Sequence, residues 1–214
     1  MKVLYKDSDI LVIVKPSGIL SEIAEDRAGK SVADSFPGLS LFPVHRLDRE
    51  TAGIMVYSLN KNSASGLSEQ IRGTEFKKKY YAVLRGRPEK DSGILEDWLC
   101  RDARKNISFV CDKSDKGAKQ ARLEYSVLYE NQGLCLTRIK LYTGRTHQIR
   151  VQFASRSLPV YGDGRYGGGG GELALFACSL SFSHPVTGKR MSFTESPDRE
   201  LFPWNLFETE DYSL

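Results

Sequence analysis

The sequence predicts a mixed α+β fold, in which a mostly antiparallel sheet is flanked by short helices and loops. Many apolar segments have the length of a strand and are bounded by Pro, Gly or Asn, whereas only two segments have helical spacing. These elements do not alternate regularly, as they would in a parallel α/β sheet. Hydrophobic residues make up 40% and charged residues 27%, a composition typical of globular proteins. We expect one domain over residues 1–214, without an internal repeat or linker.

In the first part of the chain, two buried strands precede a short helix. Residues 9–15, which contain the apolar run 10–14, predict a strand that a Pro-Ser-Gly turn ends, and residues 53–59 predict a second buried strand after a loop. Asn60 and the polar residues after it offer N-caps for a helix that ends near residue 72. Leu67 and Ile71 are four residues apart, so they would form the apolar side of this helix.

The rest of the chain is mostly strand. The expected strands are residues 76–84, 94–99, 107–110, 122–129, 135–142, 173–182 and 190–194. Residues 135–142 alternate between apolar and polar side chains, which is typical of a half-buried strand. Residues 146–155 predict a helix with Thr146 as a possible N-cap. The five glycines of residues 167–171 predict a mobile surface loop, because glycine is unfavourable inside helices and strands.

The net charge of +4 is unevenly distributed. Residues 72–87 contain six basic residues and one acid, and residues 101–122 contain seven basic residues and three acids. The tail, residues 195–214, contains six acids and one arginine. Basic blocks of this kind suit a protein that meets a polyanion on one face, although a solvated surface explains them as well.

Several classes of protein are not supported. The four cysteines contain no C-x-x-C pair, which argues against a zinc finger and for reduced, mostly buried thiols. Residues 162–167 match G-x-G-x-x-G, but four further glycines follow where a dinucleotide-binding helix would begin. His45 and Asp48 could share a metal ion only on a helix, and Pro43 argues against one there. We expect neither metal nor cofactor.

No apolar run reaches the length of a membrane span, and the charged N-terminus does not resemble a signal peptide. We therefore expect a soluble, cytoplasmic protein that does not contact membranes. A serine hydrolase is disfavoured as well, because the chain lacks the G-x-S-x-G motif.

One segment with a carboxylate between two arginines carries a family resemblance. His45 to Gly53, HRLDRETAG, resembles the signature H-R-L-D-x-x-T-[SA]-G of RluA-type pseudouridine synthases. Further stretches resemble other motifs of that family in order, namely residues 9–18 (K-P-x-G turn), 78–82 (K-x-Y-x-A), 144–151 (G-R-T-H-Q-I-R), 162–167 (G-D-x-x-Y-G) and 184–185 (H-P). The chain departs from the family at Gln152, where histidine is frequent. It also leaves no room before residue 9 for the small RNA-binding domain that many members carry.

The resemblance implies the pseudouridine synthase fold and an isomerase that converts a uridine in structured RNA, ribosomal or transfer RNA, to pseudouridine. The reaction gains and loses no atom, so the resemblance implies no cofactor. RNA would be the partner of what we expect to be a monomer. The alternative is a catalytically inactive RNA-binding protein with the same fold.

The resemblance also assigns site residues. Asp48 would act on the anomeric carbon, either as a nucleophile or by assisting loss of the base. Arg150 would be its basic partner, Tyr80 would stack on the base, Ile149 would line the pocket, and Arg46 would fill the gap that the flipped base leaves. The basic blocks add candidates for phosphate contacts, which are Lys77, Lys78, Arg101, Arg104 and Lys105. Without the resemblance, these side chains would be assigned to surface ion pairs and the core.

Overall fold

The computed structural model describes residues 1–22, 29–73 and 75–208. The chain forms two compact units, each assembled from two chain segments. The first unit combines Met1–Lys78 with Phe176–Pro197, and the second combines Lys79–Leu175 with Asp198–Leu214. Strands dominate both units, and the described residues contain two α-helices. The predicted α+β class is therefore confirmed.

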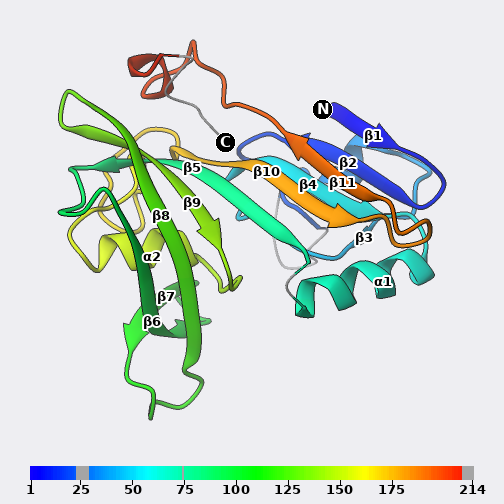
Figure 1. Ribbon diagram of the computed structural model, residues 1–214, viewed down its shortest axis with the longest axis horizontal. Coiled ribbons are helices and arrows are strands. Elements are labelled where there is room, and N and C mark those ends of the chain that lie inside the picture. The colour runs from blue at the N-terminus through cyan, green and yellow to red at the C-terminus, as the bar shows by residue number, and fades with distance from the viewer. Residues whose placement is uncertain (23–28, 74, 209–214) are drawn as a thin grey trace. The chain divides into compact units, whose positions relative to one another are not determined.

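The sheet of the first unit has the strand order β1-β2-β4-β10, and β3 and β11 pair with β4 and β10 (Figure 1). Its strands are β1 (Lys2–Lys6), β2 (Ile10–Lys15), β3 (Phe42–Pro43), β4 (Ala52–Ser58), β10 (Leu175–Ser183) and β11 (Arg190–Thr194). All pairs are antiparallel except β10 with β4. At this parallel pair a Cβ on Gly53 would lie 2.4 Å from the backbone nitrogen of Ala177. The glycine of the H-R-L-D segment is therefore required by a close strand contact.

Helix α1 (Lys61–Arg72) packs on this sheet as predicted. It begins at Asn60, whose side chain accepts a hydrogen bond from the Ser63 nitrogen at 2.9 Å. Leu67 is fully buried in a core cluster that includes Ile10 and Phe182, and Ile71 packs against that cluster. A short 3-10 helix, η1 (Val32–Ser35), precedes the β3 strand. Strand β1 was not predicted, because it offers only three consecutive apolar residues, Val3, Leu4 and Tyr5, between two lysines.

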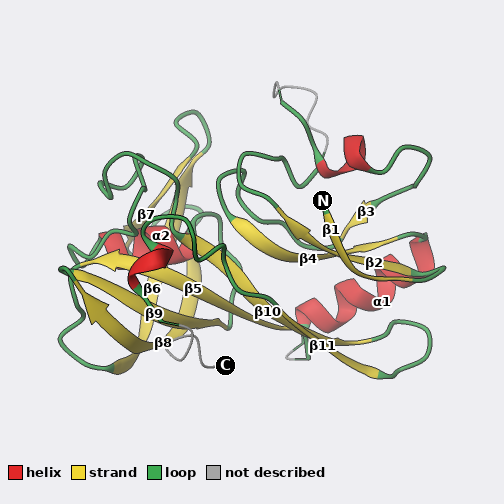
Figure 2. Cartoon of the chain, turned by 90° about the horizontal axis from the view of Figure 1, so that it is seen from above, coloured by secondary structure: helices red, strands yellow, loops and turns green. Residues whose placement is uncertain are grey.

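In the second unit, neighbouring strands follow the order β5-β9-β8-β6-β7. These are β5 (Lys77–Arg85), β6 (Ser92–Asp102), β7 (Ile107–Cys111), β8 (Lys119–Asn131) and β9 (Leu134–Leu141). Helix α2 (Gln148–Ala154) covers one face of this sheet (Figure 2). Its Val151 packs with Leu99 and Ala121, and its Phe153 ring lies 5.7 Å from the Tyr125 ring. The short helix η2 (Trp204–Leu206) follows near the end of the described chain.

Two local expectations need correction. Helix α2 is capped by His147 and not by Thr146, and His147 adopts a left-handed backbone with φ of 54°. The glycine run is not simply a mobile surface loop, since Gly168 is buried. A Cβ there would lie 1.8 Å from the Val160 carbonyl oxygen. Gly168 also donates its N–H to the Asp163 carbonyl at 2.7 Å, so it is needed for a close backbone approach.

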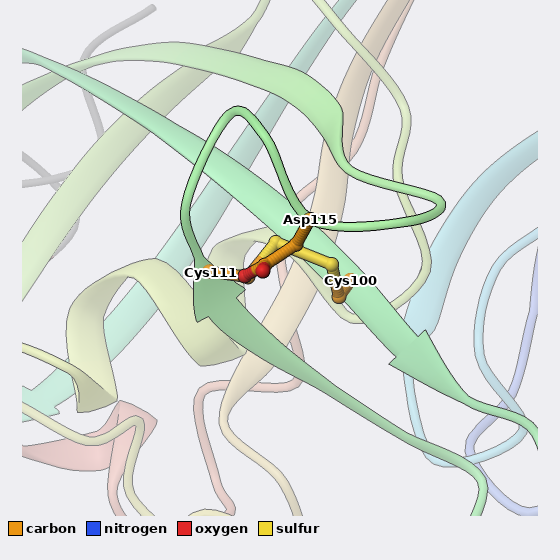
Figure 3. Close-up of side chains that lie close together, drawn as sticks. All are labelled: Cys100, Cys111 and Asp115. Carbon is orange, nitrogen blue, oxygen red and sulfur yellow. A yellow bond between two sulfur atoms is a disulfide. The ribbon is translucent and has the colours of Figure 1, made fainter.

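The cysteines also differ from the expectation of four reduced thiols. Cys100 on β6 and Cys111 on β7 form a disulfide, with a Cα–Cα distance of 5.9 Å (Figure 3). Their register is diagonal, because Cys100 lies opposite Phe109 and Cys111 opposite Trp98. The two sulfurs could meet because adjacent antiparallel strands bring their side chains together. Cys135 and Cys178 form no disulfide and are buried, as expected.

Candidate active site

The Asp48 segment is a loop that joins β3 to β4 in the first unit. Two reciprocal hydrogen bonds fix it: the Leu47 nitrogen donates to Ser21 Oγ at 3.1 Å, and Ser21 Oγ donates to the Leu47 carbonyl at 2.7 Å. The Asp48 carbonyl accepts a bond from the Thr51 nitrogen at 3.1 Å, which closes a turn. Asp48 is half-buried and lies four residues before the start of β4 at Ala52. The backbone that carries the carboxylate is thus held on both sides.

A buried lysine stabilises the same loop. Lys15, at the end of β2, is fully buried, and its Nζ donates to the carbonyls of Pro16 (2.9 Å), Ile19 (2.8 Å) and Arg49 (3.1 Å). Burial lowers the Lys15 pKa to about 8, while the negative charges of Asp48 and Glu50 act in the opposite direction. The ammonium therefore ties the turn after β2 to the loop and places positive charge near Asp48.

His45 is a structural residue. Its Nε2 accepts a hydrogen bond from the Val56 nitrogen at 3.1 Å, and its ring packs edge-on against Phe76. Burial, and secondly the charge of Lys78, lower the His45 pKa to about 3, so the imidazole is neutral at pH 7. Neither His45 nor Asp48 belongs to a group of three or more potential metal ligands among the described residues, so the His45–Asp48 metal pair considered from the sequence has no geometric support.

Arg46 extends from the loop into solvent. Its side chain is 62% exposed and forms an ion pair with Glu22, with 2.5 Å between Nη1 and Oε1. An exposed ion pair of this kind contributes little to stability, so the guanidinium can exchange Glu22 for another anion at low cost. This position is compatible with the expected contact to RNA.

In the second unit, Tyr80 lies on β5 and is 6% exposed. The side chain of its neighbour Lys79 lines a groove with Arg138 and Lys140 of β9. Neighbouring side chains on a strand point to opposite faces, so Tyr80 points to the other face of the sheet. On β8, Tyr125 packs on α2, whereas Ser126, which lines the same groove as Lys79, points away from the helix. Tyr80 is therefore on the α2 face, together with Ile149 and Arg150.

Arg150 is held by a buried ion pair. Its Nε donates to Asp163 Oδ2 at 2.7 Å and its Nη2 donates to Asp163 Oδ1 at 2.8 Å. Side-chain exposure is 3% for Arg150 and 0% for Asp163. The Tyr166 ring lies 5.3 Å from Arg150 Cζ, and the Tyr166 hydroxyl is 2.9 Å from His147 Nδ1. The G-R-T-H-Q-I-R and G-D-x-x-Y-G motifs thus meet in one network that fixes the plane of the guanidinium.

The turn before α2 is organised by Gln148. Its Oε1 accepts from Thr143 Oγ1 at 2.8 Å and from the Arg145 nitrogen at 3.0 Å, and its Nε2 donates to the Arg122 carbonyl at 3.2 Å. Ser108 of β7 donates to the Thr146 carbonyl at 2.7 Å. These bonds offset the energetic cost of the left-handed backbone of His147 at the helix start. They also fix the first turn of α2, in which Ile149 is 4% exposed and lies on the sheet.

The expected phosphate contacts occupy two places. Lys77 is exposed at the start of β5, whereas Lys78 is half-buried and burial lowers its pKa. Arg101, Arg104 and Lys105 are exposed at the tip of the β6–β7 hairpin. Asp102 shapes this tip by accepting from the nitrogens of Arg104 (2.9 Å) and Lys105 (3.0 Å).

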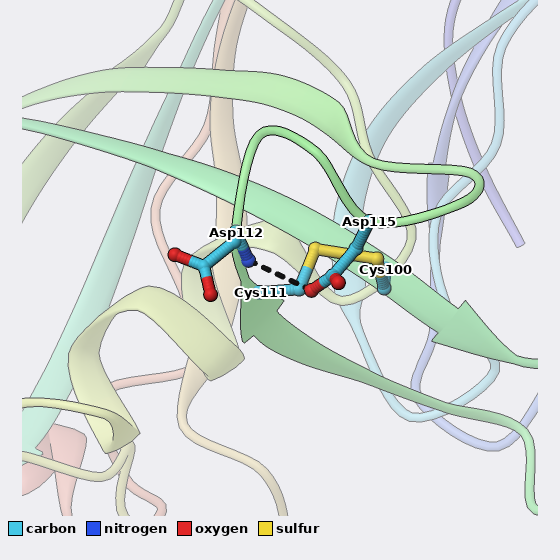
Figure 4. Close-up of a disulfide and its surroundings, with 4 residues drawn as sticks. All are labelled: Cys100, Cys111, Asp112 and Asp115. Carbon is cyan, nitrogen blue, oxygen red and sulfur yellow. Dashed lines mark hydrogen bonds between the residues drawn. A yellow bond between two sulfur atoms is a disulfide. The ribbon is translucent and has the colours of Figure 1, made fainter.

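Two further clusters contain potential metal ligands among the described residues. In Cys100, Cys111 and Asp115 the sulfurs are bonded to each other, and the Asp115 carboxylate accepts from the Asp112 nitrogen at 2.9 Å (Figure 4). In Asp7, Asp9 and His184, the His184 Nε2 lies 2.9 Å from Asp7 Oδ2. Both clusters are therefore accounted for by bonds within the protein. No described helix has the length and apolar composition needed to span a membrane.

Comparison with known proteins assigns the chain to a family. The model of the RNA pseudouridylate synthase family matches residues 9–155. The chain is 34% identical over 209 residues to the dual-specificity RNA pseudouridine synthase RluA of Yersinia pestis, covering 90% of this chain and 97% of that protein. The chain belongs to the RluA family of RNA pseudouridine synthases. It is thus a pseudouridine synthase, an isomerase that modifies RNA.

A further relative and two solved structures are also similar to this chain. An RNA pseudouridine synthase of Aquifex aeolicus is 31% identical over 236 residues, which cover 95% of this chain and 72% of that protein. The structure of human RNA pseudouridylate synthase domain containing 1 matches with a TM-score of 0.74 at 24% identity, over 94% of this chain and 84% of that chain. The human domain containing 4 gives a TM-score of 0.76 at 22% identity, over 93% and 89%. The two structures show that the synthase shares their fold.

Sequence reasoning missed several residues of the site. Lys15, His147, Asp163 and Tyr166 all lie inside motifs that the sequence contains, but their types alone suggested no role. The structure shows that Lys15 holds the Asp48 loop and that the other three surround Arg150. Of the predicted site, Asp48 and Arg46 belong to the first unit, and Tyr80, Ile149 and Arg150 to the second.

Proposed function

We propose that this synthase converts a specific uridine in structured RNA, ribosomal or transfer RNA, to pseudouridine, and that Asp48 carries the reaction. The observation that supports this most is the construction of the Asp48 loop. Ser21 and the buried Lys15 hold its backbone, and Asp48 is a half-buried residue. A carboxylate on a fixed backbone can be positioned at a reacting carbon, which is what catalysis by proximity requires.

The reaction breaks the bond between N1 of uracil and C1′ of ribose and forms a bond between C5 and C1′. Asp48 either attacks C1′ and is later displaced, or assists loss of the base and removes a proton from the neighbouring ribose carbon, to which a proton returns when C5 bonds to C1′. In both routes the proton on C5 is released to water and N1 gains one. The product is therefore an isomer of the substrate.

Arg150 is the proposed basic partner of Asp48. A guanidinium has five N–H donors, of which the bonds to Asp163 use two. The ion pair with Asp163 and the contact with Tyr166 fix the orientation of the group before substrate arrives. A cation held in this way favours the ionised form of a carboxylate within about 4–6 Å and directs it.

Tyr80 and Ile149 are proposed to hold the base. The aromatic ring of Tyr80 offers a flat face on which uracil can stack while it is detached, a contact worth about 1–3 kcal/mol. Both side chains are almost fully buried on the α2 face. A buried, apolar wall would keep the detached base from diffusing into water.

The target uridine must leave its helix, which costs a few kcal/mol. We propose that the exposed guanidinium of Arg46 replaces its ion pair with Glu22 by stacking on the neighbouring bases. Lys77, Lys78 and the hairpin cations Arg101, Arg104 and Lys105 would contact phosphates. The relative from Yersinia pestis is described as dual-specific, so more than one RNA should be offered to this synthase.

The test is release of tritium from RNA labelled at C5 of uracil, with ribosomal and transfer RNA offered separately. Asp48→Asn and Asp48→Ala should abolish release by the synthase while RNA binding is retained. Glu69→Gln, an acid-to-amide change on helix α1, is the matched control and should behave as wild type. Release by either Asp48 variant would show that the mechanism is wrong, and binding of RNA by wild type without release from any pool would contradict the proposed reaction.

A further inference from the structure

The second unit has a basic face that the proposed reaction does not use. On β8, Ala121 and Tyr125 pack on α2, so Arg122, Glu124 and Ser126 point to the opposite face. Their partners across the strand pair are Lys140 opposite Glu124 and Arg138 opposite Ser126. We call the surface formed by Lys79, Arg122, Glu124, Ser126, Arg138, Lys140 and Tyr142 the outer basic face.

The outer basic face contains a groove of about 290 Å³. Its lining consists of Lys79, Glu124, Ser126, Arg138 and Lys140. Three of these five side chains are cations, and within the described part of the chain no carboxylate lies within 4 Å of Lys79 Nζ. A hollow with converging cations and a hydroxyl group offers both charge and hydrogen-bond donors to an anion.

Tyr142 organises the cations beside the groove. Its ring lies 5.1 Å from Arg122 Cζ and 4.7 Å from Lys140 Nζ, and it is 47% exposed. Its hydroxyl donates to Glu124, and this bond, with the charges of Lys140 and Arg122, lowers the Glu124 pKa. Glu124 therefore stays ionised. Glu124 pairs with Lys140 at 3.5 Å and Glu96 pairs with Arg122 at 3.3 Å, so two of the four cations of the face have these acids as neighbours.

We propose that the outer basic face binds the phosphate backbone of a second segment of the RNA substrate, away from the target uridine. This rests on the proposed function, because it takes RNA as the substrate. Arg138 and Lys140 are two residues apart on β9, so they point the same way and are separated by roughly 7 Å along the strand. Such a row of cations suits a linear polyanion, and its contacts carry no sequence preference.

The position of the face makes a distinctive prediction. Lys79 and Tyr80 are neighbours on β5, so the outer basic face lies on the side of the sheet opposite the one that carries Tyr80 and Arg150. A single stem-loop that presents its uridine to Tyr80 cannot cover both faces. A whole folded RNA has further helices that can extend around the sheet edge. The outer basic face should therefore increase the affinity of the synthase for the whole RNA and not its affinity for the isolated stem-loop.

The test compares two triple variants that remove the same charge. Lys79→Gln with Arg138→Gln and Lys140→Gln changes the outer face. Lys6→Gln with Lys61→Gln and Lys189→Gln, three exposed lysines of the first unit, is the control. Dissociation constants are measured over a range of salt concentrations for the whole folded RNA that supports tritium release and for the stem-loop around its uridine.

We expect the outer-face variant to bind the whole RNA roughly tenfold or more weakly, with a slope of log K against log salt reduced by about 2 to 3, as loss of three phosphate contacts requires. Binding of the stem-loop should match the control. Unchanged affinity and slope for the whole RNA, or equal weakening for both RNAs, would overturn the proposal. If the triple variant does not fold, Lys79→Gln with Lys140→Gln should reduce the slope by about 1 to 2. Because the readout is binding, failure here is distinct from failure of tritium release.

Discussion

At the scale of single residues, the site depends on buried charges with defined partners. Arg150 and Asp163 are both nearly inaccessible to water, and their two hydrogen bonds compensate for the loss of hydration. For the buried Lys15 ammonium, hydrogen bonds to three backbone carbonyls compensate for the loss of hydration. A buried charged group that has few other hydrogen-bond partners within reach is held in one position. A reaction at a single carbon atom needs side chains that are held in this way.

The Arg150–Asp163 pair gives a first prediction. Asp163→Asn removes the negative charge and leaves the guanidinium buried without it, which should lower the free energy of unfolding by about 3–5 kcal/mol. Tritium release should fall more steeply than RNA binding, because Arg150 loses its fixed orientation. Urea denaturation and tritium release measure the two effects, and Glu172→Gln, an exposed carboxylate nearby in sequence, is the control. Wild-type stability and turnover in Asp163→Asn would disprove the positioning role.

His45 gives a second prediction, on acid stability. Its pKa is about 3 in the folded protein and 6.5 when unfolded, so between these values the unfolded state binds more protons. Stability is therefore lost as pH falls from 6.5 towards 3. His45→Gln, which can still accept the Val56 N–H, should lose stability less steeply, by up to about 1.4 kcal/mol per pH unit. Denaturation at pH 6.5, 5.5 and 4.5 tests this, and parallel curves for the two proteins would show that His45 does not titrate on unfolding.

At the scale of elements, the β6–β7 hairpin contains a disulfide between its two strands and exposed cations at its tip. The Cys100–Cys111 disulfide closes a loop with a sequence separation of 11, and the exposed cations Arg101, Arg104 and Lys105 lie within that loop. The spacing of the two cysteines matches no motif, so the pairing becomes visible only with the register of the two strands. This is why reduced thiols were expected and why that expectation was wrong for this pair.

The disulfide gives a third prediction. A closed loop of this length restricts the unfolded chain, so the oxidised protein should be more stable than the reduced protein by about 2–3 kcal/mol. Cys100→Ser with Cys111→Ser should match the reduced protein and should not respond to a reductant. Urea denaturation with and without dithiothreitol measures the difference. A wild-type protein with equal stability in both conditions would show that the bond does not form in solution.

At the scale of the whole molecule, local signals were sufficient for most elements. Asn60 predicted the start of α1, and the alternation over residues 135–142 predicted a strand whose Arg138 and Lys140 face solvent. The division into two units was not predicted, because two of its three boundaries fall inside strands, at Lys78–Lys79 in β5 and at Leu175–Phe176 in β10, and only the third, Pro197–Asp198, lies in a loop. A boundary within a strand leaves no linker composition for a reader of the sequence to find.

The site was predictable only in part, for a similar reason. The motifs indicated Asp48, Tyr80 and Arg150, but the partners that fix them come from distant positions. Ser21 lies 26 residues from Leu47, and Arg49 lies 34 residues from Lys15. Such pairs depend on tertiary contacts and leave no trace in local spacing.

The central claim is that the Asp48 carboxylate performs the isomerisation. Its most direct test is a single-turnover measurement of tritium release by Asp48→Asn, with the dissociation constant for the same labelled RNA measured in parallel. We predict no release above background and an affinity equal to that of the wild-type synthase. Tritium release by Asp48→Asn at a rate comparable to wild type would contradict the claim.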